Sequence, residues 1–240
     1  MHIRATSLEP IDPLYQANFE HVLTQDLRKH LVTHEPSFWL STTIDLARNL
    51  IGSLLVRQGE PTLIGRIVET EAYPVGDPAS HAFRGSTARC APMFLAPGRA
   101  YIYVAYGLHR MLNVSAEDEG LGAAVLIRAV ELLRHSAEVS NIKLKANHRI
   151  ASGPGLVARA FNIDLGMNGA DLTKPGALWI ARPNYPVTSV ASSPRIGISK
   201  NKDVLWRFFD AQSTCISRGM PKSSTPSTTL LDSVSYERRN

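Results

Sequence analysis

Cysteine is scarce in this sequence of 240 residues, and Cys90 and Cys215, the two that occur, lie far apart. They form no CxxC pair, which excludes a disulfide framework and the usual zinc or iron–sulfur cages. We therefore expect no metal and a reducing compartment.

Long apolar runs are also missing. A run such as GAAVLI at 122–127 is far shorter than a membrane span, which takes about 20 apolar residues. The first residues, MHIRATSLEPIDPLYQ, lack the apolar centre of a signal peptide. We expect no membrane association and a protein that stays in the compartment where it is made.

No stretch is a solid block of one charge, although 26 Lys and Arg outnumber 21 Asp and Glu. The formal charge of +5 and the pI near 9.4 are compatible with a polyanionic partner. Many basic proteins bind no nucleic acid, so the charge alone does not establish such a partner. Any basic surface has to be assembled by folding.

The composition, 44% hydrophobic and 20% charged, is that of an ordinary globular protein. We expect one main domain at 36–213 and an N-terminal extension at 1–35. That extension has apolar residues near helical spacing, which are Phe19, Val22, Leu23, Leu27 and Leu31. Residues 214–240 are rich in Ser and Thr and poor in large apolar groups, which predicts a disordered tail.

The main domain is predicted to contain short helices and several strands. One helix covers about 44–51, with Ser41 or Thr42 as its N-cap and Gly52 at its end; a second, shorter one follows the Gly-Pro-Gly turn in SGPGLVARAFNI. The predicted strands are SLLVR, LIGRIVETEAY, both halves of RAYIYVAYGLHRMLNVS, AAVLIRAVELL, ALWIAR and SPRIGIS. This order lacks regular βα alternation and predicts an α+β fold.

A hairpin is predicted at 99–115, with its tight turn at Tyr106, Gly107 and Leu108. Alternation places Tyr101 and Tyr103 on one face and Tyr106 near the tip. A tyrosine on an exposed tip suits a wedge between stacked bases. Strand tyrosines are more often core residues or cross-strand pairs, so this interpretation needs further support.

The strand RIVETEAY places Ile67, Glu69, Glu71 and Tyr73 on one face if it is regular. A face open to water is the simplest interpretation, because carboxylates are mostly solvated. Arg128 points to another, since it follows AAVLI, a run apolar enough to be buried on both faces. A buried guanidinium needs an anionic partner, and such a pair serves either the scaffold or a site.

Several of these stretches carry a family resemblance. GRIVETEAYPVGDPASHAFRG, MFLAPGRAYIYVAYGLHRMLNVS, AAVLIRAVE and SGPGLVARAFNI resemble, in order and spacing, the alkyladenine (3-methyladenine) DNA glycosylases. The resemblance covers about 38–210. It implies a single mixed domain with a curved antiparallel sheet, surrounding short helices and a protruding hairpin. It also implies a monofunctional enzyme that flips damaged purines (3-methyladenine, 7-methylguanine, hypoxanthine, ethenoadenine) from duplex DNA and hydrolyses the N-glycosidic bond.

The resemblance also implies roles for single residues. Glu71 would be the general base for the attacking water, helped by Arg128. The flipped base would lie among Tyr73, His81 and Tyr103, with Asn113 rejecting guanine through its exocyclic amine. Tyr106 would fill the gap left in the duplex, beside Leu108, which stands where methionine is common. Apart from the resemblance, the basic residues Arg195, Lys200 and Lys202 are candidate phosphate contacts.

A lysine is missing between Leu63 and Arg128, so this stretch offers no amine for the Schiff base of a strand-cleaving glycosylase. We expect a monomer without cofactor, cytoplasmic and nucleoid-associated in a bacterium or nuclear in a eukaryote. Two alternatives stay open: a catalytically silent nucleic-acid-binding module, which would need neither Glu71 nor Arg128, and a small-molecule nucleoside hydrolase, which would need neither wedge nor basic face.

Overall fold

The computed structural model describes residues 31–60, 62–134, 150–183, 187 and 189–217. Backbone contacts divide the chain into residues 1–32 and 33–240, and the fold below is that of the second unit. It begins three residues before the predicted domain start. The helix predicted in 1–35 lies outside the described residues, apart from its last predicted position at 31.

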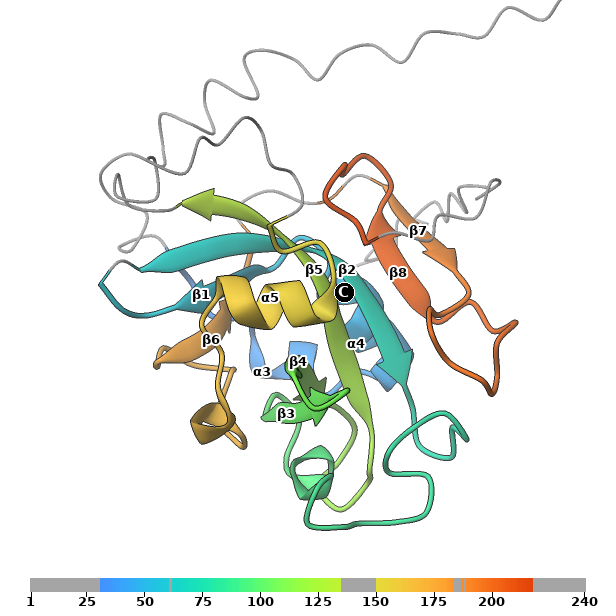
Figure 1. Cartoon of the computed structure of the whole chain (residues 1–240). Coiled ribbons are helices and arrows are strands. Elements are labelled where there is room, and N and C mark those ends of the chain that lie inside the picture. The colour runs from blue at the N-terminus through green and yellow to red at the C-terminus, as the bar shows by residue number, and fades with distance from the viewer. Residues whose placement is uncertain (1–30, 61, 135–149, 184–186, 188, 218–240) are drawn as a thin grey trace, which may run out of the picture. The chain divides into compact units, whose positions relative to one another are not determined.

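The centre of the fold is a curved antiparallel sheet (Figure 1). Its strands in the described part of the chain are β1 Leu54–Arg57, β2 Leu63–Tyr73, β3 Ala100–Ala105, β4 His109–Ser115, β5 Ala124–Arg134, β6 Leu178–Ala181, β7 Val190–Ser193 and β8 Arg207–Asp210. The order is β3-β4-β5-β2-β1-β6, and β8 pairs with both β2 and β7. The α+β class and the curved antiparallel sheet are confirmed.

Strand β2 is covered along both edges. It pairs with β5 over almost its whole length, with β1 through residues 63–66 and with β8 through residues 69–71. The pairing with β5 shifts register around Glu69, so the simple alternation expected for this strand is interrupted there. The acidic stretch of β2 therefore lies between two neighbouring strands, in the interior of the sheet.

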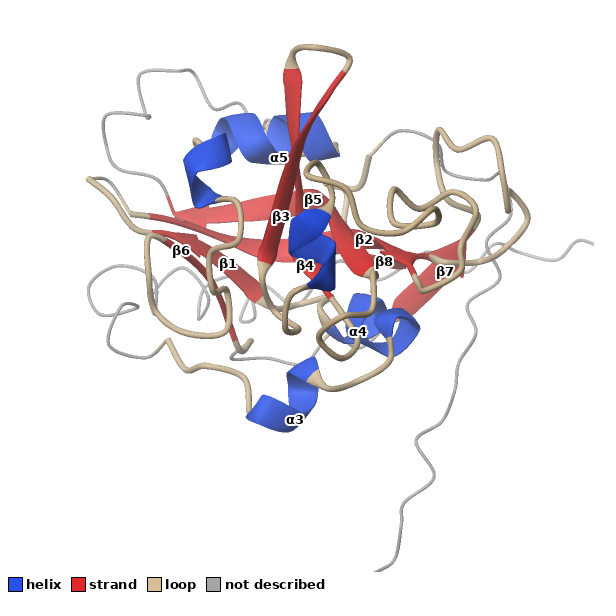
Figure 2. Cartoon of the chain, turned by 90° about the horizontal axis from the view of Figure 1, so that it is seen from below, coloured by secondary structure: helices blue, strands red, loops and turns tan. Residues whose placement is uncertain are grey.

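Short helices cover the two faces of the sheet, with α4 (Thr43–Asn49) and α5 (Pro154–Ala160) on opposite sides (Figures 1 and 2). Thr42 caps α4 as predicted, since its hydroxyl accepts the backbone N–H of Asp45. The remaining described helices are α3 Pro36–Trp39 and the 3-10 turns η1 Ala91–Phe94 and η3 Leu165–Met167. None of the helices in the described ranges has the length and apolarity needed to cross a membrane.

The main core fills the space between the sheet and these helices. Buried side chains from both helices and from the strands form one cluster, among them Leu46, Val114, Ile127, Val157 and Ile180. This packing fixes β2 and β5 against each other, which is what holds the polar groups on them in place.

Two predictions for the last part of the domain are wrong. Only Ser193 of SPRIGIS is in a strand, as the last residue of β7, and residues 194–199 are a loop, because Pro194 lacks a backbone N–H and Gly197 adopts a positive φ of 76°. The packed structure also continues past 213, since Cys215 and Ser217 are buried. The tail predicted for 218–240 lies outside the described residues.

Candidate active site

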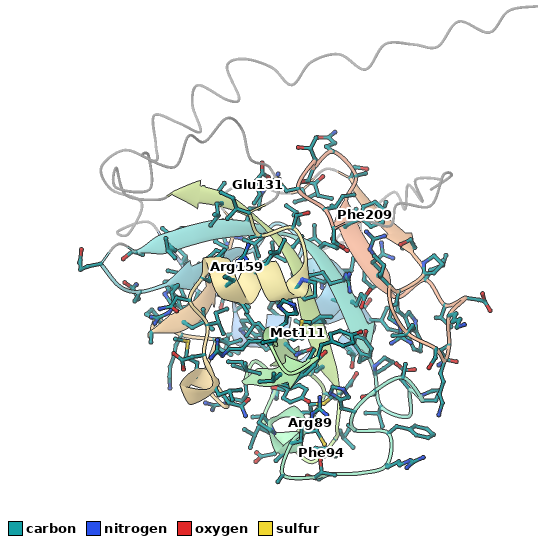
Figure 3. All side chains as sticks on the ribbon, in the orientation of Figure 1. Arg89, Phe94, Met111, Glu131, Arg159 and Phe209 are labelled. Carbon is teal, nitrogen blue, oxygen red and sulfur yellow. The ribbon has the colours of Figure 1, made fainter. Side chains whose placement is uncertain are left out.

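A cavity of about 730 Å³ opens beside the ends of β2, β3, β4 and β5. It brings together most of the residues selected from the sequence, which are Tyr73, His81, Tyr103, Tyr106, Asn113, Arg128 and Lys200. Figure 3 shows two further residues of its lining, Met111 on β4 and Arg89 in the loop after His81. Residues 196–199, in the loop between β7 and β8, also line it.

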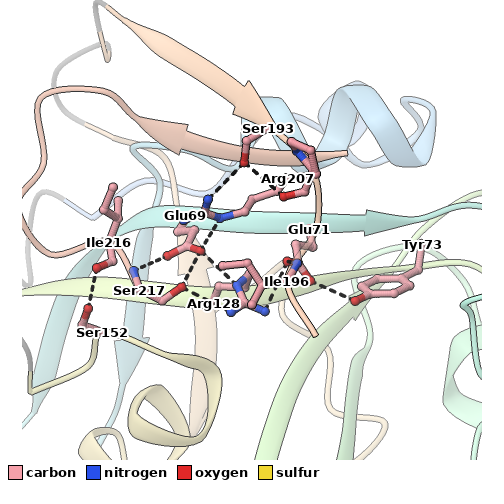
Figure 4. Close-up of polar contacts among 11 residues, drawn as sticks. Glu69, Glu71, Tyr73, Arg128, Ser152, Ser193, Ile196, Arg207, Ile216 and Ser217 are labelled. Carbon is pink, nitrogen blue, oxygen red and sulfur yellow. Dashed lines mark hydrogen bonds and ion pairs between the residues drawn. The ribbon is translucent and has the colours of Figure 1, made fainter. Parts of the chain in front are cut away.

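Glu71 lies directly behind this cavity and is fully buried. Its Oε1 is 3.2 Å from Nη1 of Arg128 and accepts the backbone N–H of Ile196 at 2.7 Å. Its Oε2 accepts the Tyr73 hydroxyl at 2.9 Å (Figure 4). The interpretation of this strand face as open to water is wrong, because β5, β8 and the loop at Ile196 enclose the carboxylate.

Glu69 is equally buried and forms a second anionic position on β2. Its Oε1 accepts Nε of Arg128 at 3.0 Å and Nε of Arg207 at 2.7 Å. Burial alone would raise the pKa of Glu69, but the two guanidinium groups and hydrogen bonds from Ser217 outweigh it and hold that pKa below its ordinary value. Glu69 is therefore a permanent anion at neutral pH.

Arg128 joins the two carboxylates and lines the cavity, with 7% of the residue exposed. Burial would lower the pKa of its guanidinium, but Glu71 and Glu69 outweigh this and raise that pKa. The predicted pairing of a buried arginine with the ETE acids is confirmed in geometry. The pair places a cation and a carboxylate together at the wall of the cavity.

Aromatic rings also line the cavity. The rings of Tyr101 and Tyr103 are stacked at 5.4 Å, so alternation placed them on one face correctly. His81 meets Tyr103 edge-on at 4.6 Å, and its Nδ1 lies 2.8 Å from the Tyr101 hydroxyl. Tyr73 contributes a fourth ring from β2. Rings arranged in this way can stack on a flat ligand.

These aromatic groups are neutral at physiological pH. Burial, with the adjacent Glu71 carboxylate, raises the pKa of Tyr73, so its hydroxyl stays a donor. Burial also raises the pKa of Tyr103. Burial and the nearby Arg89 guanidinium lower the pKa of His81. A neutral imidazole does not repel a cationic ring placed beside it.

Asn113 lies on β4 opposite Tyr101, with 4% of the residue exposed. Its Nδ2 donates to the carbonyls of Tyr101 at 3.0 Å and Met111 at 3.4 Å. Two backbone acceptors hold the amide in one orientation, so it forms a fixed part of the cavity wall.

The tip of the β3–β4 hairpin projects beyond the rest of the described fold, while the base of the hairpin pairs with β5 (Figure 2). Its turn is the predicted one, with Tyr106 at φ 52° and Gly107 at φ 73°. Tyr106 is 89% exposed and Leu108 is 81% exposed. A groove of about 540 Å³ lies between this tip and α5. Two large exposed side chains on a narrow tip can insert into the surface of a binding partner.

The prediction that Arg195 contacts phosphate is wrong in this structure. Its side chain is fully buried and forms an ion pair with Asp77, and its guanidinium lies 4.6 Å from the ring centre of Tyr73. It also donates to the Ala72 carbonyl at 2.9 Å. Lys200 and Lys202 are exposed. Arg195 instead holds the loop that carries Ile196 against Glu71.

Sequence reasoning missed the groups that arrive from distant loops and from strand β8. Ile196 contributes a backbone N–H, Asp77 holds Arg195, and Arg207 and Ser217 hold Glu69. One sequence signal could have found Arg207, because it is a charged residue inside the aromatic run WRFF and a buried arginine needs an anionic partner. Within the described ranges, no three His, Cys, Asp or Glu side chains come together as metal ligands.

Comparison with known proteins gives one consistent result. The family model described as methylpurine-DNA glycosylase matches residues 37–214. A protein of Mesorhizobium japonicum is 46% identical over 174 residues, which cover 70% of this chain and 81% of that protein. One from Methanocella arvoryzae is 43% identical over 194 residues, covering 77% and 95% respectively. Both carry the provisional name 3-methyladenine DNA glycosylase.

Proposed function

The chain belongs to the methylpurine-DNA glycosylase family and is a DNA glycosylase of base excision repair, and we propose that it flips alkylated or deaminated purines out of the duplex. The proposed substrates are 3-methyladenine, 7-methylguanine, hypoxanthine and ethenoadenine. The observation that carries the proposal is the buried pair of Glu71 and Arg128 beside an aromatic cavity, next to an exposed tyrosine hairpin.

The proposed chemistry is hydrolysis of the bond between C1′ and the base nitrogen. As that bond breaks, its electron pair leaves with the base and positive charge grows on the sugar. A water bound beside Arg128 attacks C1′ and gives a proton to Glu71. The buried carboxylate also stabilises the charge on the sugar, in a site that excludes bulk water. 3-Methyladenine and 7-methylguanine are already cations in the duplex and leave as neutral bases, so a single acid–base residue is enough for them. Hypoxanthine and ethenoadenine are neutral in the duplex and have to gain one proton on a ring nitrogen as they leave.

The cavity is proposed to select the base by stacking. A flipped purine would lie among Tyr73, His81 and Tyr103, whose neutral rings tolerate or attract a cationic base. The fixed amide of Asn113 would meet the 2-amino group of guanine and exclude it sterically. Extruding a base costs on the order of a few kcal/mol and least for a damaged base, which adds to the selection.

Tyr106 and Leu108 are proposed to enter the duplex where the nucleotide has left. Unstacking a base step costs on the order of a few kcal/mol, and an aromatic wedge offsets part of this by stacking on the neighbouring bases. Lys200 and Lys202 are proposed to contact the phosphates. A wedge of this kind has no use in a nucleoside hydrolase.

The enzyme is proposed to be monofunctional. Lys200 lies outside the lysine-free stretch and does place an amine in the cavity lining. Its Nζ lies 5.9 Å from the ring centre of the exposed Phe83, and the role proposed for it is the phosphate contact given above. Four duplexes, each with one of the four proposed lesions, test both parts of the proposal. We expect released base and an intact strand that breaks only after alkali. Breaks without alkali would contradict monofunctional chemistry, and no released base from any of the four lesions would contradict the proposed substrates.

A further inference from the structure

The last described residues of the chain return to the acidic part of β2. Segment 213–217 is anchored by Cys215, which packs with Val68 and Ala129, and by the Ser152 hydroxyl, which donates to the Ile216 carbonyl at 2.7 Å. At its end Ser217 is only 5% exposed. This segment lies beyond the predicted end of the domain, yet it supplies groups to the buried charges.

Ser217 completes the environment of Glu69. Its backbone N–H donates to Oε2 of Glu69, and its hydroxyl donates to Oε1 at 2.7 Å. The same hydroxyl oxygen accepts Nη2 of Arg128 at 3.2 Å (Figure 4). Ser217 therefore bridges the Glu69 carboxylate and the Arg128 guanidinium with one oxygen atom.

These contacts determine the direction of Arg128. A guanidinium is planar and presents its donors in a fixed fork. Arg128 donates hydrogen bonds from Nε to Glu69 at 3.0 Å and from Nη2 to Ser217. Two of its three nitrogens are therefore fixed on the side away from Glu71. The plane of the group then directs the third nitrogen, Nη1, to Glu71.

We propose that Ser217 and Glu69 are positioning residues for the glycosylase reaction, which aim Nη1 of Arg128 at Glu71 and at the cavity. Glu69 neutralises Arg128 from behind and fixes one nitrogen, and the Ser217 hydroxyl fixes another. Without the hydroxyl, Nη2 loses its acceptor, and the guanidinium can turn and change its contacts with Glu69 and Glu71. The C-terminal segment is thereby part of the active site.

A merely structural role for this network would make a different prediction. Ser152 fastens the same segment through the Ile216 carbonyl, and within the described residues it hydrogen-bonds to neither Glu69 nor Arg128. If the network only holds the segment down, loss of either hydroxyl should act alike. If Ser217 aims Arg128, only loss of the Ser217 hydroxyl should slow bond cleavage. Ser152 is therefore the matched control.

The test is single-turnover base release by the full chain, with enzyme in excess over a lesion-bearing duplex. For Ser217→Ala we expect the saturating rate constant to fall about tenfold, as for loss of one hydrogen bond to a charged group, with half-saturation unchanged. Ser217→Thr keeps a hydroxyl and should recover to within about threefold of the wild-type rate. Ser152→Ala should keep the wild-type rate, with urea unfolding recording the stability of each variant.

Ser217→Val provides a second comparison if Ser217→Ala proves too unstable, because valine and threonine have the same shape and differ by the hydroxyl. A wild-type rate in Ser217→Ala or Ser217→Val, or an equal loss in Ser152→Ala, would overturn the proposal. The inference rests on the proposed function, but the experiment distinguishes failure of the inference from failure of the proposed function. If only the inference fails, the wild type and Ser217→Ala both release the base, whereas failure of the proposed function leaves even the wild type inactive.

Discussion

Arg128 and Glu71 form an ion pair of 3.2 Å between adjacent strands, at a point where the carboxylate is fully buried and the arginine lines the cavity. The desolvation of such a pair can exceed the attraction between its charges, so burial of this kind is a weak source of stability. Its position at the cavity wall is explained by a role in the reaction proposed for that cavity.

Tyr106→Ala should weaken capture of the flipped state while leaving the fold intact. The side chain is 89% exposed, so its loss should change the free energy of unfolding by no more than about 0.5 kcal/mol. Loss of stacking on a base should cost about 1 to 3 kcal/mol in the flipped complex. Fluorescence of 2-aminopurine beside the lesion measures flipping. An unchanged signal would show that the tip is not the wedge.

The stability of the protein should depend on Glu69 in acid. Because the folded pKa of Glu69 lies below its ordinary value of 4.5, its charge stabilises the fold above pH 4.5. That contribution is lost as the pH falls through the folded pKa. Urea unfolding should therefore show a gap between wild type and Glu69→Gln that is full at pH 7 and narrows below pH 4.5. The exposed Glu60→Gln should show little difference at any pH. A gap independent of pH would contradict the assignment.

Salt dependence should separate the exposed lysines from Arg195. Lys200→Gln or Lys202→Gln should weaken duplex binding on any sequence and reduce the slope of log K against log salt by about 1. Arg195→Gln should leave that slope unchanged and destabilise the fold by about 3 to 5 kcal/mol, because it leaves Asp77 buried without its partner. A reduced slope for Arg195→Gln would restore the role predicted from the sequence.

Asn113→Ala should relax the choice of base. The amide is held by two backbone carbonyls and cannot turn away from a 2-amino group, whereas alanine leaves space there. Excision of guanine opposite a mismatched base should rise relative to hypoxanthine by roughly tenfold or more, since one poorly accommodated group is worth about 1 to 3 kcal/mol. An equal change for both bases would show that Asn113 does not discriminate.

Much of the sheet could be predicted from the sequence because its strands carry local signals. β2 and the hairpin combine β-branched and aromatic residues with clear ends, and their boundaries were correct. β7 and β8 have four residues each and exist because β8 pairs with β2, a contact between distant segments. SPRIGIS has the alternation of a strand, but Pro194 and Gly197 override that signal.

The site was predictable where its residues share an element and less so where loops meet. Arg128 was paired with the acids of β2 because a buried guanidinium needs an anion. The same argument was not applied to Arg195, which looked like a surface cation because its partner Asp77 is more than a hundred residues away in the sequence. Ser217 carried no local signal, since a serine in a polar tail is unremarkable until the chain folds back.

The central claim is that Glu71 activates the water that releases the base. Its most direct test is the single-turnover rate constant for excision of hypoxanthine by Glu71→Gln, with enzyme saturating. Glutamine has nearly the same shape but cannot accept the proton, so the rate constant should fall by about 10² to 10⁴ while affinity for the duplex is retained. A rate constant within a fewfold of the wild type would contradict the account.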